Sequence, residues 1–253
     1  MIHDIQKAGI WKRIAAWMFD MILMGVLVVG CGLLLSWVLG YDGYSTAVDE
    51  AYAHYESQYG IVFEITQEEY LALEDVQRQA YDAAYEALIA DEAAMKAYNM
   101  MTNLSLVIIT FGILLAILVW EFFMPLWFGN GQTLGKKIFG LCLVRIDGVQ
   151  INTLQLFTRT LLGKFTIETM IPVYILLMLF WGTMDLTGTL ILAVLGIGQC
   201  LCLAVSRQHG AIHDLLAGTC VVDKASQTIF RSTEELIEYQ KKLAAERAAR
   251  QAY

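Results

Sequence analysis

The chain has little proline, cysteine or charge for its length: 2 prolines, 5 cysteines and 17% charged residues among 253. No cysteine lies between residues 40 and 103, the most acidic part of the chain, so we expect no disulfide framework. Cys200 and Cys202 would point to different sides of a helix, without histidine or carboxylate neighbours. We therefore expect no metal site and no cofactor.

Signatures of catalysis and of nucleic-acid binding are also missing. Residues 129–137 read GNGQTLGKK. They depart from a phosphate-binding loop because Asn130 replaces its first glycine and Lys137 replaces its serine or threonine. No serine or cysteine nucleophile has a recognisable base nearby, so we expect that the protein is not an enzyme. No basic stripe alternates with exposed aromatics, so we expect no nucleic-acid partner.

What the chain has in abundance is apolar sequence, with 57% hydrophobic residues and a mean hydropathy of +0.53. About 20 such residues cross a bilayer, and four segments are long enough: Ile14–Leu39, Leu104–Phe128, Leu161–Trp181 and Leu186–Val205. The first is too long for a signal-peptide core and lacks a small-residue cleavage site. We therefore predict an all-α integral membrane protein with four transmembrane helices, whose partner is the lipid bilayer.

Basic residues predict the orientation of these spans, because they accumulate on the cytoplasmic side. The connection 40–103 has 2 basic residues against 13 acidic ones, a net charge of −11, whereas 129–160 has 4 basic residues and the tail after 205 has 7. We therefore predict cytoplasmic N- and C-termini. The chain then divides into residues 1–40 (tail and first span), 41–103 (acidic extracytoplasmic insert), 104–223 (remaining membrane core with cytoplasmic loop 129–160) and 224–253 (cytoplasmic helix).

The insert is predicted to be helical. One helix should cover Thr46–Tyr59, and a second should begin at Thr66, where Glu69 completes a capping box, and run to about Met101. Apolar residues at helical spacing along the second helix predict either a self-packed hairpin or a surface for a partner. These residues are Tyr70, Leu73, Val76, Tyr81, Tyr85 and Leu88.

Two cytoplasmic elements are also predicted. Leu141–Ile146 and Val149–Asn152 flank the turn signal Asp147-Gly148, and Thr219–Val222 could join them as a third strand in a small sheet. A solvated helix should begin at Ser232, where Glu235 stands three residues later.

Asp20 is the one charge in Ile14–Leu39. A carboxylate inside such a helix costs roughly 2.5–3.5 kcal/mol on insertion scales, so it marks a candidate functional site. Arg13 shares its helix face about 10 Å away along the axis. The alternative is that Asp20 packs the bundle through a hydrogen bond to a neighbouring helix.

Other charges are expected near the same membrane surface. Glu121 and Glu168 each lie about 10 Å in from the cytoplasmic end of their spans. Arg159 and Lys164 could pair with them, and His213 and Asp214 could fold back beneath them. Crowded carboxylates should retain a proton or bind a cation, or the cluster is structural and neutralised by arginine. His213-Asp214 could relay protons or merely cap local backbone.

The two prolines repeat one pattern, since residues 121–125 read EFFMP and residues 168–172 read ETMIP. A helical proline frees the carbonyl four residues earlier, which belongs here to a glutamate. A freed carbonyl beside a carboxylate suits a desolvated cation. Coincidental kinks are the alternative.

Three stretches resemble the RDD family of bacterial membrane proteins: AGIWKRIAAWMFD (8–20), GQTLGKKIFGLCLVRID (131–147) and HDLLAGTCVV (213–222). The family is named for one arginine and two aspartates, which match Arg13, Asp20 and Asp214. Arg159 fits a basic position usual before the third span. The large acidic insert departs from a minimal family domain.

The resemblance implies a multi-pass protein of the bacterial plasma (inner) membrane, with transport suggested and cation/proton antiport proposed for some members. We hypothesise a small transporter, a homo-oligomer because four helices are few, in which Asp20 and Glu121 bind a monovalent cation or proton and Arg13 resets the site. The alternative is a non-transporting scaffold or accessory subunit whose insert binds an envelope partner.

Overall fold

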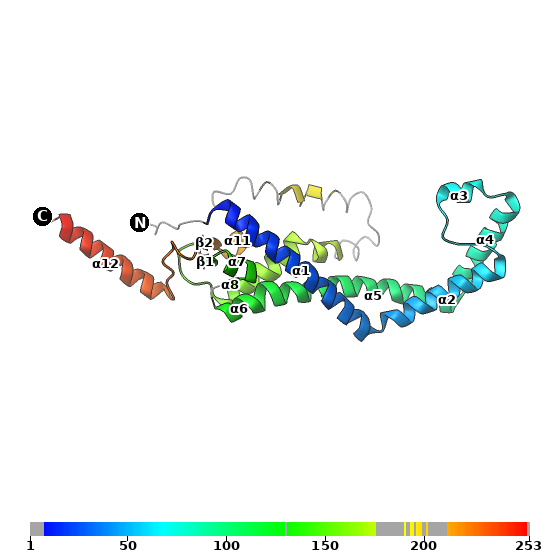
Figure 1. Cartoon of the computed structure of the whole chain (residues 1–253), viewed down its shortest axis with the longest axis horizontal. Helices are drawn as coiled ribbons and strands as arrows, with labels where there is room; N and C mark the ends of the chain where they lie inside the picture. Colours follow the sequence, from blue (N-terminus) through cyan, green and yellow to red (C-terminus); the bar gives the residue numbers. More distant parts are fainter. Residues whose placement is uncertain are drawn as a thin grey trace. The chain divides into compact units, whose positions relative to one another are not determined.

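The computed structural model describes residues 8–129, 131–175, 190, 193–194, 196–198, 201 and 212–251. These residues are mostly helical, with one small sheet (Figure 1). Two helices, η1 and η2, have π-helical hydrogen bonding. The helices are α1 (Ile10–Leu39), α2 (Tyr41–Tyr59), α3 (Gln67–Ala72), α4 (Asp75–Ala90), α5 (Glu92–Ile117), η1 (Leu118–Phe123), α6 (Met124–Phe128), α7 (Leu134–Ile138), α8 (Thr153–Phe157), η2 (Thr158–Glu168), α11 (Ile212–Ala217) and α12 (Thr233–Gln251), and the strands are β1 (Leu141–Arg145) and β2 (Thr219–Asp223).

Two described helices are long and apolar enough to cross a membrane. They are α1, with 30 residues, and the continuous helix Glu92–Phe128, with 37 residues, which α5, η1 and α6 form together. They contain the first two predicted spans. The fourth predicted span, Leu186–Val205, lies mostly outside the described residues. Four spans and cytoplasmic termini therefore stay predictions.

In the third predicted span, Leu161–Trp181, the described part is not one continuous helix. The helix begins earlier, at Thr153, because Asn152 accepts a hydrogen bond from the backbone N–H of Gln155 (2.7 Å) and completes a capping box. It ends at Glu168, and Met170 then adopts a left-handed backbone with φ 55°. Pro172 falls in the first turn of the following helical segment, where its missing N–H costs nothing.

The chain forms two compact units, Val28–Ile113 and Met1–Leu27 with Leu114–Tyr253. In the first of these, α2 packs on α4 through Val48, Ala84 and Leu88, which are buried. Tyr52, Phe63, Tyr81 and Tyr70 make successive edge-to-face ring contacts at 5.2–5.7 Å, so much of the aromatic stripe packs within the insert. Val76, in contrast, is exposed.

The insert differs from its prediction at helix boundaries. The capping box of Thr66 and Glu69 is confirmed, but a single helix to Met101 is wrong because it is interrupted twice. Glu74 starts a new capping box with Gln77. The carboxylate of Asp91 accepts hydrogen bonds from the N–H groups of the next helix, at 2.9 and 3.2 Å. These capping side chains favour new starts over continuation. The preceding helix begins at Tyr41, earlier than Thr46.

The small sheet lies in the other unit. β1 pairs antiparallel with β2, with Cys142 opposite Val222, so the predicted pairing of these segments is confirmed. The expected strand 149–152 reduces to single bridges, including Val144 to Gln150. Burial raises the pKa of the Cys142 thiol to about 11, so this cysteine is an inert core residue.

The sheet supports the elements around the charged residues. One face of β1 packs Leu141 and Leu143 against Ala16 of α1 and Leu156 of α8. Lys12 near the start of α1 also pairs with Asp223 at the end of β2 (2.7 Å). The sheet thereby fixes the position of the first turns of α1.

The C-terminal helix α12 begins as predicted, since the N–H of Glu235 donates to the hydroxyl of Ser232 (3.3 Å). It is not solvated along its whole length. Leu236 is buried against Val149 and Phe230, with Tyr239 packed beside them. The first turns of α12 therefore belong to the core of its unit.

Candidate functional site

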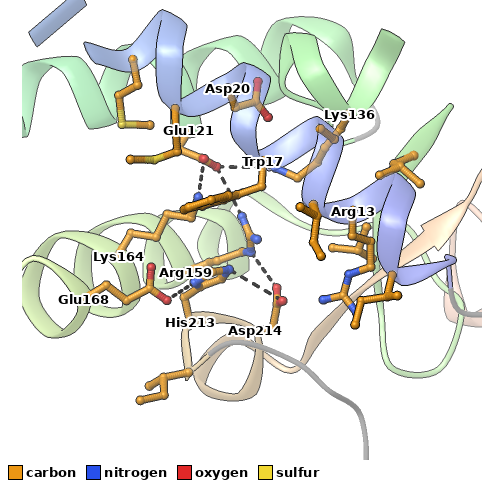
Figure 2. A pocket seen from close by; sticks show the side chains of 18 residues that line it. Arg13, Trp17, Asp20, Glu121, Lys136, Arg159, Lys164, Glu168, His213 and Asp214 are labelled. Atoms are coloured by element: carbon orange, nitrogen blue, oxygen red, sulfur yellow. Dashed lines mark hydrogen bonds and ion pairs between the residues drawn. The ribbon is translucent and has the colours of Figure 1, made fainter. Parts of the chain in front are cut away.

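Charged side chains from five helices meet in one cavity of about 570 Å³ (Figure 2). The helices are α1, η1, α7, η2 and α11, which come from distant parts of the sequence. The cavity is lined by four basic residues, four acidic residues and a histidine: Arg13, Lys136, Arg159, Lys164, Asp20, Glu121, Glu168, Asp214 and His213. Apolar residues of α1, with Leu141, Ile212 and Val221, complete the lining.

Glu121 lies at the centre of this group. It is 2% exposed and faces three basic side chains. Lys164 donates to Oε1, while Arg159 Nη1 and Lys136 Nζ lie 3.5 and 3.7 Å from Oε2. A buried carboxylate keeps its charge when such partners surround it.

Arg159 joins Glu121 to a second acid. Its Nε donates to Oδ1 of Asp214 (3.0 Å), and Thr219 Oγ1 donates to the same oxygen (3.1 Å). Arg159 and Asp214 are both almost fully buried. Loss of one partner in such a buried pair typically costs 3–5 kcal/mol, so this pair is the fixed part of the cluster.

His213 continues the chain of contacts. Its Nδ1 pairs with Glu168 Oε1, and its Nε2 lies 3.7 Å from Asp214 Oδ2. Burial, then the charges of Arg159 and Lys164, lower the pKa of His213 well below its ordinary value. His213 is therefore neutral at pH 7, and one of its ring nitrogens can accept a hydrogen bond.

Lys136 is the cation of the cluster that can lose its proton near physiological pH. Its side chain is 11% exposed. Burial, opposed by the charge of Glu121, lowers its pKa to about 8. An ammonium with this pKa exchanges its proton near physiological pH, unlike a guanidinium.

Asp20 lies beside this chain of ion pairs and makes different contacts. Its Oδ1 accepts hydrogen bonds from the indole of Trp120 (3.1 Å) and from the N–H of Gly135 (2.8 Å), and its Oδ2 accepts from the hydroxyl of Thr133 (2.5 Å). All three donors are uncharged. The carboxylate thus ties α1 to η1 and to the start of α7.

Two local features let the helices approach this closely. Gly163 on η2 touches α11, and a Cβ there would lie 2.6 Å from Cα of His213. The carbonyl of Glu121, which Pro125 leaves without its helical N–H donor, accepts a hydrogen bond from Thr160 (3.0 Å). The carbonyl singled out by the proline pattern is therefore used by a neighbouring helix.

The structure brings together most of the residues that the sequence singled out. Five of them form one series of contacts: Glu121, Arg159, Glu168, His213 and Asp214. Arg13 and Asp20 line the same cavity. Because basic side chains separate the acids, the expected crowding of carboxylates is relieved by ion pairs.

Sequence reasoning missed Lys136, Thr133 and Trp120. The first two lie in the stretch 131–147 that carries the family resemblance, which was the available signal. The pattern of residues 129–137 by itself gives no sign that Lys136 pairs with Glu121. No group of three or more His, Cys, Asp or Glu side chains in the described ranges could hold a metal ion.

Comparison with known sequences gives one match. The sequence model of the RDD family matches residues 7–218, a range that includes α1 and every residue of the cluster. Neither a curated protein nor a solved structure matches the chain.

Proposed function

The chain belongs to the RDD family, and on this premise we propose that it is a multi-pass protein of the bacterial plasma membrane that exchanges a monovalent cation for a proton. The proposed site is Glu121. One observation carries the proposal: a buried carboxylate on a helix able to span the membrane faces a cavity and is held by two lysines and an arginine.

The exchange follows from competition for the carboxylate. Oxygen ligands suit hard cations such as Na⁺, but the ammonium of Lys136 occupies the neighbourhood of Glu121 Oε2 at 3.7 Å. When Lys136 releases its proton, a cation can take the place of its charge. One proton leaves as one cation arrives, so the charge of the site is unchanged.

The remaining members of the cluster hold the side chains of the site in position. Arg159 and Asp214 form the buried pair, and Lys164 holds the other oxygen of Glu121. The neutral His213, paired with Glu168, adds no further positive charge to the same cavity. Arg13 also lines the cavity and supplies positive charge to the empty site.

The test is transport in liposomes that contain the purified protein and a trapped pH dye. Pulses of Na⁺, K⁺ and Li⁺ are applied to wild type, to Glu121→Gln and to Glu68→Gln, the same change at an exposed position of α3. The proposal predicts a cation-dependent pH change in wild type and in Glu68→Gln, and none in Glu121→Gln. Equal signals from wild type and Glu121→Gln would contradict it.

The alternative function is a non-transporting scaffold. In the described residues, the one buried side-chain polar atom without a hydrogen bond is Nε of Arg78, in the insert. Each fully buried polar side-chain atom of the charged cluster thus has a hydrogen-bond partner, as in a structural cluster. Folded wild-type protein that moves none of the three cations would favour this alternative, with the insert as the surface for an envelope partner.

A further inference from the structure

Asp20, the charge that stands alone in the first span, touches no basic side chain in the part of the chain that the structure describes. Its partners are an indole, a hydroxyl and a backbone N–H. It is 5% exposed, and these donors take up three of the roughly four acceptor positions of its two oxygens. A cation ligand needs oxygens that are free to bind the ion, whereas these already fasten three segments together.

The contact with Thr133 leads directly to Lys136. The hydroxyl of Thr133 donates to Asp20 Oδ2 at 2.5 Å and accepts from Nζ of Lys136 at 3.3 Å. The same hydroxyl caps α7 by accepting the backbone N–H of Lys136 (3.4 Å). Both the backbone and the ammonium of Lys136 are therefore placed by a residue that Asp20 holds.

Gly135 shows that this contact is built into the fold. A Cβ at Gly135 would lie 2.9 Å from Cγ of Asp20 and would overlap the carbonyl oxygen of Ala16. The close approach of α7 to α1 thus requires glycine at this position, because any side chain would separate the N–H of Gly135 from the carboxylate.

We propose that Asp20 is a positioning residue that fastens the start of α7 to α1 and thereby holds Lys136 against Glu121. Asp20 does not bind the exchanged cation. The inference concerns the site of the proposed exchange and rests on that function for its consequence, but the geometry that it asserts can be measured without transport.

Substitution of Asp20 by asparagine or by leucine distinguishes a positioning role from a cation-binding role. In Asp20→Asn the remaining carbonyl oxygen can still accept from Trp120 and Gly135, so α7 stays fastened to α1 although the amide group cannot accept the hydroxyl of Thr133. In Asp20→Leu all three contacts are lost. A positioning role therefore predicts that asparagine largely preserves the placement of Lys136, whereas a cation-binding role predicts that asparagine is as damaging as leucine.

The measurement is the rate at which an amine-reactive acylating reagent labels Lys136, relative to the adjacent exposed Lys137, by mass spectrometry of the purified full chain. In wild type Lys136 should react more slowly than Lys137. Asp20→Leu and Gly135→Ala should bring the two labelling rates together, and Asp20→Asn should stay near wild type.

Gly43→Ala, where a Cβ would meet no atom within 4 Å, is the matched control for Gly135→Ala. Thr133→Val should give a labelling rate of Lys136 between those of wild type and Asp20→Leu. It replaces Asp20→Leu in the test if that variant does not fold.

Cation exchange is then measured on the same variants. The proposal predicts that Asp20→Asn retains more exchange than Asp20→Leu, with a loss for leucine of about tenfold or more, as expected for removal of a buried hydrogen-bonded anchor. Unchanged protection of Lys136 in Asp20→Leu and Thr133→Val would overturn the positioning role. Equal loss of exchange in Asn and Leu, with Lys136 still protected in Asn, would also overturn it. Absence of exchange in wild type would instead contradict the proposed function and leave the labelling result to decide the role of Asp20.

Discussion

The hydroxyl of Thr160 donates a hydrogen bond to the backbone carbonyl of Glu121 at 3.0 Å, where Pro125 cannot supply the usual helical donor. Thr160 is fully buried. This bond links η2 to η1 at the residue whose side chain forms the centre of the charged cluster. It therefore fixes the backbone of Glu121 independently of the ion pairs that its carboxylate makes.

The bond predicts that Thr160→Val destabilises the protein. Valine has nearly the same shape, so the main change is an unsatisfied buried carbonyl, which costs about 1–3 kcal/mol. Chemical unfolding in detergent measures the change in the free energy of unfolding. Thr153→Val, at an exposed position of α8, should change it little, and an equal effect of the two substitutions would contradict this role of Thr160.

The charged neighbours of His213 predict how stability depends on pH. It faces Glu168, Lys164 and Arg159 on η2 and Asp214 on its own helix, and the charges of Lys136 and Arg13 also reach it. Burial is the main reason that its folded pKa lies below the ordinary 6.5. The unfolded chain therefore binds more protons than the folded chain once the pH falls below about 6.5.

The contribution of His213 should be fully present above pH 6.5 and be lost as pH falls toward its folded pKa, by up to about 1.4 kcal/mol per pH unit. Unfolding curves at successive pH values measure this slope. His213→Gln should flatten it. His54→Gln, at an exposed position of α2, should leave it unchanged, so the same slope in His213→Gln and wild type would contradict the assignment.

The pKa of Lys136 predicts how the rate of cation/proton exchange depends on pH. Its folded pKa is about 8, so its proton is available above that value and retained below it. Exchange should therefore rise with pH up to about 8 and fall about tenfold for each pH unit below it. Lys136→Arg keeps its charge throughout this range and should remove the rise. The same change at the adjacent exposed residue, Lys137→Arg, should preserve it. An unaltered profile in Lys136→Arg would exclude Lys136 as the source of the proton.

The predicted orientation has its own test, because a single cysteine, introduced after the 5 native cysteines are replaced by serine, reports which side of the membrane a residue faces. Ser57→Cys in α2 should react with an impermeant maleimide added to right-side-out vesicles, since basic-residue counts place the insert outside. Ser226→Cys, after β2, should react only once the membrane is permeabilised. Both positions are exposed. Reaction of Ser226→Cys in sealed vesicles would contradict cytoplasmic placement of the C-terminal segment.

The sequence predicted well those features that depend on residues near one another in the chain. The two long apolar helices, the capping box at Thr66 and the turn at Asp147-Gly148 each follow from local rules of length, capping and glycine conformation. The same rules were incomplete where two signals competed. Asp91 can continue a helix or begin a new one, and the structure uses it as a cap.

The site was predicted as a set of residues but not as a set of pairs. Charge inside apolar segments identified Asp20, Glu121 and Glu168, because burial of charge is costly wherever it occurs. Which cation pairs with which acid depends on packing between distant segments, such as α7 against α1. The need for glycine at position 135 becomes evident only from the packing of these two helices. The sequence therefore showed Lys136 only as one of the 4 basic residues in the connection 129–160.

If a cation and a proton compete for the surroundings of Glu121, cation binding must release protons from the protein, and this release can be measured without transport. Na⁺, K⁺ or Li⁺ is added to weakly buffered purified protein near pH 8, the approximate pKa of Lys136, and the released protons are followed with a dye. Competition at Glu121 predicts saturable proton release by at least one cation in wild type, and none in Glu121→Gln or Lys136→Arg. Folded wild-type protein that releases no proton with any of the three cations would contradict it.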